Sequence, residues 1–298
     1  MTPGHRVWVA ALLLLADAAL AQTLIQADRT VASDSPEGWA MRYFAGTTLM
    51  TSFGETPRLA PGSFSAAVEL GSIPRLSAEQ QHVGFGGSKR EDLNKSPVVG
   101  RLRLALGLPD EWVAEFGFTP PLQLAGSQAR TMFAGAIGRR LIDSEPFSLS
   151  VRALAQAGKV AGDITCPRRT SGDFDPVNNP LGCVAPSQDT FTANYYGVDA
   201  TAAWSTGPWQ LYASGGIVRA PLRVQVDAFV GLTHDRSKIT SNSDLPWLTF
   251  GARYAFDPKW SAGVEMLYVP LDVRRPPAAP SVSDPLWSVR GQIRYAFD

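Results

Sequence analysis

Apolar and polar positions alternate along most of the chain, most clearly at its C-terminal end. From Trp287 to Phe297 the odd positions carry large apolar side chains or glycine, and the even positions carry polar or small ones. The same period of two covers Trp260–Val269 and Leu248–Phe256, which the short segment Asp257-Pro258-Lys259 joins. This period is that of a β-strand with one apolar and one polar face. We therefore expect an all-β protein.

Further segments repeat the pattern towards the N-terminus. Alternation is clear in Val98–Leu106, Trp112–Phe118, Phe147–Ala155, Tyr196–Trp204 and Trp209–Ile217, and weaker in Trp39–Thr51, Phe64–Ile73, Ala129–Leu141 and Leu222–Leu232. We expect about twelve strands, within a range of about ten to fourteen, most near the ~10 residues that cross a bilayer when tilted.

Two folds share this alternation, a soluble sandwich and a transmembrane barrel. Aromatic residues stand at the ends of the predicted strands, as in the girdles of membrane barrels, at Trp39, Trp112, Trp204, Trp209, Trp247, Trp260, Tyr268, Trp287 and Phe297. Charged residues recur in the middle of the polar faces, and short turns alternate with long loops. These features favour an antiparallel transmembrane β-barrel with long extracellular loops.

The N-terminal segment has the pattern of a secretory signal peptide. Arg6 precedes the apolar run Val7–Ala16, and Ala19-Leu20-Ala21 is a small-x-small cleavage pattern. We expect cleavage between Ala21 and Gln22. Residues 22–37 would then form an N-terminal extension or a small plug, and residues 38–298 the barrel. No later apolar run is long enough for a spanning helix.

Taken together, these features resemble the bacterial outer-membrane β-barrel superfamily: a signal peptide, amphipathic strands throughout, and a closing strand that ends in Tyr295-Ala296-Phe297. The resemblance implies the outer membrane of a Gram-negative bacterium, contact with its lipid, and recognition of the last strand by the barrel-assembly machinery. We expect a monomer.

Such barrels have an even number of strands, with both chain ends at the periplasmic side. The short and long connections fit this rule if Leu222–Leu232 is part of an extracellular excursion, which leaves eleven strands. An additional strand in Gln22–Val31 restores twelve. Alternatively, Trp39–Thr51 is not a full strand and the count is ten. We expect twelve.

Composition narrows the chemistry further. The 27 Lys and Arg balance the 27 Asp and Glu, which argues against a nucleic-acid partner. With three His and two Cys, we expect no metal site and no cofactor. Cys166 and Cys183 flank a stretch rich in Gly, Asp, Pro and Asn, so in an exported protein we expect a disulfide that closes this loop.

The phase of the strands directs a set of charged residues into the lumen: Arg42, Glu69, Arg101, Arg103, Glu115, Arg152, Asp199, Asp227, Arg253, Glu265, Arg290 and Arg294. They either pair with one another and stiffen the barrel, or orient a small solute in a pore. The loop Ser72–Pro97 either enters the lumen as a constriction or covers the rim.

A channel or transporter for small solutes is the expected function, and we expect no enzyme. The alternative is a closed structural or adhesive barrel that acts through its extracellular loops. Less favoured is a lipid hydrolase that uses His234, near Asp235 and Ser237.

Overall fold

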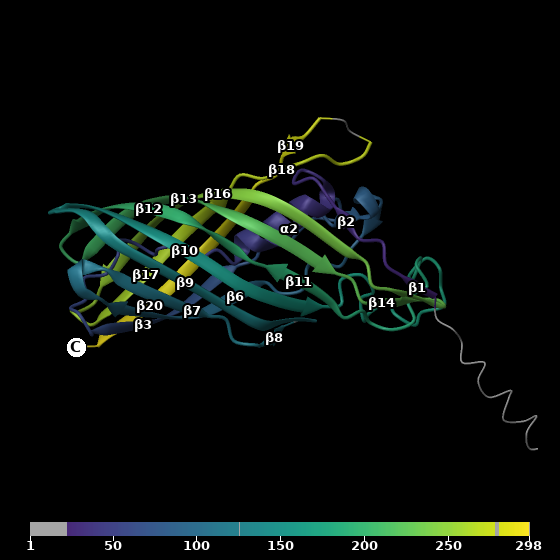
Figure 1. The fold of residues 1–298 in the computed structure, drawn as a ribbon, viewed down its shortest axis with the longest axis horizontal. Helices are drawn as coiled ribbons and strands as arrows, with labels where there is room; N and C mark the ends of the chain where they lie inside the picture. The colour runs from purple at the N-terminus through teal and green to yellow at the C-terminus, as the bar shows by residue number, and fades with distance from the viewer. Residues whose placement is uncertain (1–22, 125, 278–279, 298) are drawn as a thin grey trace, which may run out of the picture.

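The computed structural model describes residues 23–124, 126–277 and 280–297, so the predicted signal peptide and its cleavage site at Ala21 and Gln22 lie outside the described residues. Strands that follow one another along the chain pair in an antiparallel ring, which closes where the last strand pairs with the first (Figure 1). The ring strands are β3 (Phe64–Ser72), β6 (Val98–Gly107), β7 (Val113–Phe118), β9 (Ser127–Ser144), β10 (Phe147–Gly162), β12 (Tyr195–Thr206), β13 (Trp209–Gln225), β16 (Lys238–Ala255), β17 (Trp260–Val269) and β20 (Leu286–Phe297).

The prediction of an all-β antiparallel barrel is confirmed, but the expected count of twelve strands is wrong: the ring has ten. Its two ends differ. At one end the connections are short, over residues 108–112, 145–146, 207–208 and 256–259, and we call this end the short-turn rim. At the other, the long-loop rim, the connections span residues 73–97, 119–126, 163–194, 226–237 and 270–285.

The outer surface of the ring is apolar. Large apolar side chains that stand exposed on it include Val68, Leu70, Leu104, Phe116, Ile137, Val198, Leu211, Phe250, Val264, Val289 and Ile293. Aromatic rings line its edges: Phe64 stacks on Phe297 with centroids 4.4 Å apart at the short-turn rim, and Tyr268 contacts Trp287 towards the other rim. Two of the expected girdle residues, Trp39 and Trp247, are instead fully buried inside the barrel.

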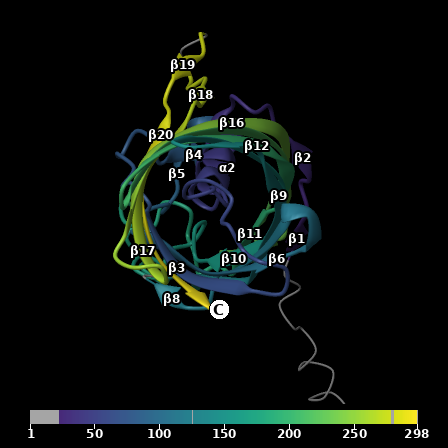
Figure 2. The same cartoon turned by 90° about the vertical axis from the view of Figure 1, so that its left-hand side faces the viewer.

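Residues 36–47 form the helix α2 (Pro36–Thr47), which lies inside the ring (Figure 2). The strand expected at Trp39–Thr51 is therefore wrong. Ser35 caps the helix, because its hydroxyl accepts a hydrogen bond from the Gly38 amide over 3.1 Å, and Pro36 occupies the first turn, where its missing N–H costs nothing. Within the part of the chain that the structure describes, no helix is long and apolar enough to cross a membrane.

After α2 the chain continues through the lumen and reaches the short-turn rim, where β3 begins. We call residues 36–63 the plug. Leu49, Met50 and Phe53 of this segment are almost completely buried. The lumen is therefore filled by the chain itself, and the filling segment lies C-terminal to the predicted 22–37 extension.

The first described residues lie at the long-loop rim. There β1 (Thr23–Ile25) pairs with β15 (Thr233–Asp235), which also pairs with β14 (Ala228–Val230), and β2 (Arg29–Thr30) pairs with the protruding end of β16. The chain expected to leave the ring around Leu222–Leu232 does so after Gln225, where β13 ends. Because Trp39–Thr51 also forms no strand, the ring has ten strands.

The predicted disulfide between Cys166 and Cys183 is confirmed, with Cα atoms 5.7 Å apart, and it packs against Val226 and Ala228 at the same rim.

Inside the barrel, the two halves differ in polarity. In the long-loop half, α2 packs in one apolar cluster with inward side chains of the wall, among them Val218, Leu245, Trp247 and Leu267. The loop of residues 73–97 joins this cluster through Leu76, Val83 and Leu93, so it covers the mouth rather than constricting an open pore. The other half, around the extended part of the plug, is lined by charged and hydroxyl side chains.

Candidate functional site

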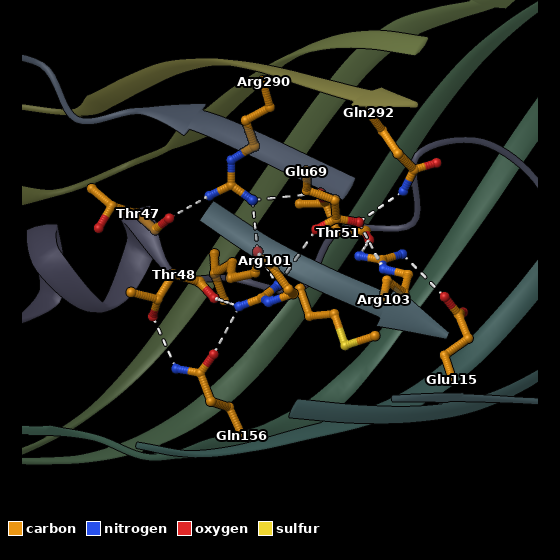
Figure 3. A network of polar contacts seen from close by, with 12 residues as sticks. Thr47, Thr48, Thr51, Glu69, Arg101, Arg103, Glu115, Gln156, Arg290 and Gln292 are labelled. Carbon is orange, nitrogen blue, oxygen red and sulfur yellow. Dashed lines mark hydrogen bonds and ion pairs between the residues drawn. The ribbon is translucent and has the colours of Figure 1, made fainter. Parts of the chain in front are cut away.

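Charged side chains from the inner wall form a continuous network in the middle of the lumen (Figure 3). Arg103 pairs with Glu69 over 2.7 Å and with Glu115 over 3.0 Å. Arg152 pairs with the other oxygen of Glu115 over 2.9 Å and with Asp199 over 2.6 Å. All five side chains are nearly inaccessible to solvent. Buried charges need such partners, because an unpaired one would bear the full cost of leaving water.

The same arginines also hold the plug. Arg101 donates to the Thr48 carbonyl over 2.6 Å, Arg103 to the Thr51 carbonyl over 2.7 Å, and Arg152 to the Met50 carbonyl over 3.1 Å. These carbonyls belong to an extended segment of the plug that does not pair with the strands of the wall. The guanidinium groups therefore donate the hydrogen bonds that a neighbouring strand would otherwise supply.

Arg290 binds the end of α2. It donates to the Thr47 carbonyl over 3.0 Å (Figure 3). It also donates to the carbonyl of Gly46 over 3.0 Å and to that of Leu49 over 2.6 Å. The last carbonyls of a helix have no partner within it and carry a partial negative charge, so a cation is favourable there. On the neighbouring strand β17, Glu265 lies directly across from Arg290 in the pairing and accepts a hydrogen bond from the Thr51 hydroxyl. The network therefore fastens the plug across the barrel.

A second feature is a gap in the wall of the long-loop half. Pairing between β6 and β7 ends at Leu102 and Phe118, and pairing between β7 and β9 ends at Phe118 and Phe133. Both β6 and β9 continue towards the long-loop rim. The end of β9 pairs there with β8 (Gln123–Leu124), but the described residues of β6 pair with neither β8 nor β9, so the wall is open on that side of β6. β7 stops because Thr119 is followed by Pro120 and Pro121, which have no N–H to donate to a ladder. We call this opening the wall gap.

An apolar cavity of about 440 Å³ lies behind the wall gap and extends through it. Its inner lining includes Met41 and Phe44 of α2 and Phe191 of β11 (Asp189–Ala193). Its lining also includes Leu70 and Leu102, which stand on the outer surface. One space therefore connects the apolar interior of the long-loop half with the outside of the barrel wall. We call it the apolar cavity.

No protein-family model and no curated protein matches the chain. Solved structures with similar barrels include the outer membrane protease OmpT from Escherichia coli, at 10% identity over 79% of this chain and 94% of that chain, with a TM-score of 0.39. A Pseudomonas aeruginosa FadL homologue shares 11% identity over 87% of this chain and 70% of that one, with a TM-score of 0.35. Neisserial surface protein A shares 10% identity over 78% of this chain and 97% of that chain, with a TM-score of 0.31. Likeness at this level concerns barrel architecture and carries no statement about activity.

Membrane location follows from the barrel itself. A closed ring with an even number of strands, an apolar exterior, aromatic edges and a polar interior is the architecture of outer-membrane proteins. The fold is that of a transmembrane β-barrel.

The residues predicted to line the lumen fall into two groups. Ten lie on ring strands and are buried or half-buried inside the barrel: Glu69, Arg101, Arg103, Glu115, Arg152, Asp199, Arg253, Glu265, Arg290 and Arg294. Two do not belong to the wall. Arg42 is not on the wall because its segment forms the helix α2. Its guanidinium donates a hydrogen bond to the Asp272 carbonyl over 2.7 Å. Asp227 lies beyond β13 at the long-loop rim and contacts His234.

His234 does not form the hydroxyl pair that a hydrolase would need. Its Nε2 lies 2.7 Å from Asp227, and its ring stacks on Phe229. The hydroxyl of Ser237 instead donates to Asp235 over 2.6 Å. Both contacts hold the small sheet at the long-loop rim together.

Sequence reasoning missed the apolar cavity and the helix that borders it. Two local signals were available. Ser35-Pro36-Glu37 is a helix start, with a capping hydroxyl, proline in the first turn and an early acid. Pro120-Pro121 marks the early end of a wall strand. Neither signal alone reveals that the two segments face each other across the cavity.

Proposed function

We propose that the protein is an outer-membrane carrier for a small apolar solute, which it binds in the apolar cavity and exchanges with the surrounding lipid through the wall gap. One observation carries the proposal: inward residues such as Phe44 and lipid-facing residues such as Leu102 line the same space. A solute in that space passes between the interior and the membrane without crossing water.

The plug supports a lateral route. A straight hydrated pore needs a free cross-section, and here residues 47–53 occupy the lumen at the level of the charged network. Four arginines that would line such a pore bind plug carbonyls instead: Arg101, Arg103, Arg152 and Arg290. The apolar cavity lies beside α2, on the long-loop side of the segment that closes the lumen. A solute can therefore reach the cavity through the wall gap while the plug is in place.

The lining also indicates the class of solute. A cavity of about 440 Å³ holds one small molecule. Its walls are mainly apolar, with a few polar groups at the edges, including Glu37, Glu91 and Lys95. Such edges orient a ligand while apolar contact supplies most of the affinity. A compact hydrocarbon or aromatic compound fits this description.

Binding of a neutral naphthylamine dye to the refolded protein in nanodiscs tests the proposal. Gly100 stands on the edge of the wall gap, and a Cβ there would meet only ordinary contacts, 3.4 Å from Leu70. We expect Gly100→Phe to cover the outer mouth and weaken dye binding about tenfold or more, equivalent to ~1.4 kcal/mol.

Ala213→Phe is the matched control, because Ala213 is exposed on the outer surface of β13 and does not line the apolar cavity. It should bind the dye like the unmodified protein. The carrier function would be overturned if the unmodified protein showed no saturable dye binding. It would also be overturned if both variants bound the dye as tightly as the unmodified protein.

A further inference from the structure

A second cavity, of about 480 Å³, lies at the short-turn rim below the plug, and we call it the vestibule. Three arginines line it: Arg58 of the plug, which pairs with Asp143 and Glu145, Arg253 on β16 and Arg294 on β20. Arg253 is 7% exposed. Within the described residues, neither the Arg253 nor the Arg294 guanidinium has an ion-pair or hydrogen-bond partner. This distinguishes them from the arginines higher in the lumen.

Charge is balanced above the vestibule but not in it. In the network, the arginines at 101, 103, 152 and 290 are matched by four carboxylates, those of Glu69, Glu115, Asp199 and Glu265. Glu55 of the plug lines the vestibule together with Arg253 and Arg294, and it accepts a hydrogen bond from Ser148. Of the other charged lining residues, Arg58 pairs with Glu145, and Asp257 and Lys259 lie in the turn between β16 and β17. Inside the barrel, the vestibule therefore has two guanidinium groups for one carboxylate.

The position of Arg253 is set by the plug. Gly54 has a φ of +106°, and a Cβ at that residue would come within 3.1 Å of the Arg253 guanidinium. The absence of a side chain at Gly54 therefore lets the backbone of the plug pass directly beside Arg253. Arg253 therefore lies against the plug backbone and also lines the vestibule.

Hydroxyl groups complete the lining. Ser261 on β17 lies directly opposite Arg294 in the strand pairing, between the two arginine-bearing strands. Ser65 on β3 also borders the vestibule and is buried. Guanidinium and hydroxyl donors converging on one space are the set that recognises an oxyanion, since each bond to a charged acceptor is stronger than a neutral one.

We infer that the vestibule is a binding site for a small oxyanion, a carboxylate or a phosphate group, held by Arg253 and Arg294 with Ser261. This site is separate from the apolar cavity and does not depend on the carrier function. Its mouth faces the short-turn rim, so the anion enters from that side of the membrane. The same chemistry fits a free anion and the phosphate of a lipid headgroup.

Isothermal titration of inorganic phosphate and of acetate into detergent-solubilised, lipid-free protein at constant ionic strength tests the site. We expect saturable binding of at least one anion and a loss of about tenfold or more in Arg294→Gln, because charge-assisted hydrogen bonds are lost. Arg219→Gln is the matched control, since Arg219 is an exposed arginine paired with Asp244 away from the vestibule. It should leave binding unchanged.

Ser261→Ala provides a second variant in case the arginine substitution prevents folding, and we expect it to weaken binding about threefold. Vesicles of phosphatidylglycerol and of phosphatidylcholine distinguish the sources. Thermal stabilisation by the first alone, lost in Arg294→Gln, assigns the site to a lipid phosphate. No saturable binding of any of these probes, or equal binding in Arg294→Gln and Arg219→Gln, would overturn the oxyanion site.

Discussion

Arg290 on the closing strand donates a hydrogen bond to the Leu49 carbonyl over 2.6 Å, and this contact joins the last element of the barrel to the segment that fills its lumen. The two residues are 241 positions apart along the chain. The strand that closes the ring therefore also holds the end of α2. Closure of the barrel and seating of the plug are coupled through this side chain.

Replacing Arg290 by Met is expected to loosen the plug. The carbonyls of Gly46, Thr47 and Leu49 would each lose the hydrogen bond from Arg290, and Glu265 would lose a nearby positive charge, at a cost of about 2–4 kcal/mol. In planar bilayers we expect the unmodified protein to remain closed and Arg290→Met to open in discrete conductance steps. Steady conductance from the unmodified protein would contradict a lumen closed by the plug, and Arg219→Met should behave as the unmodified protein does.

Gly54 and Gly62 both have positive φ, of +106° and +86°, but only Gly54 has close neighbours. Alanine at Gly62 should cost about 1 kcal/mol, for the backbone conformation alone. Alanine at Gly54 should cost about 3 kcal/mol, because its Cβ would also meet Gln210 and Arg253. Thermal unfolding of both variants measures the difference, and equal losses would show that the plug does not pack closely there.

Glu91 makes the long-loop rim sensitive to pH. Burial raises the pKa of its carboxyl from 4.5 to about 7, and Asp189 and Glu37 act in the same direction, against the ammonium of Lys89 at 2.8 Å. The folded loop binds this proton more tightly than the unfolded one. Its contribution to stability is therefore complete below pH 4.5 and is lost as the pH rises through about 7.

Hydrogen exchange in residues 76–93, corrected for the intrinsic rate, should be slower at pH 5 than at pH 8. Glu91→Gln should remove that difference, because the amide does not titrate. A pH dependence that persists in this variant would assign the effect to another group.

The disulfide should stabilise the long-loop rim and not the barrel. Cys166 and Cys183 are 17 residues apart, and closing a loop of that length contributes about 3 kcal/mol in the chain-entropy description. In Cys166→Ser/Cys183→Ser we expect faster proteolysis within residues 167–182 and an unchanged unfolding temperature of the ring. A large loss of barrel stability would show that the rim and the wall unfold together.

Local patterns were sufficient for the wall of this barrel. Alternation in segments such as Leu248–Phe256 specifies which side chains face lipid, because a strand presents successive residues to opposite sides whatever its neighbours are. The same phase placed Arg101 and Arg290 on the inner face. The pairing of Cys166 with Cys183 also followed from spacing and compartment.

The contents of the lumen depended on contacts that no local pattern encodes. α2 is buried on every side, so Trp39, Met41 and Tyr43 need not form one apolar stripe, and the segment shows no helical period to recognise. The predicted number of strands was too high partly because this helix was expected to be a strand.

Sequence alone thus determined the barrel, its two faces and its disulfide, all of which follow from local periodicity and spacing. Only the tertiary structure decided that Arg101 and Arg290 bind plug carbonyls while Arg253 and Arg294 have no partner among the residues that the structure describes. The reason is physical: the partner of an inward charge is set by which distant segment fills the lumen, and that is decided when the ring closes.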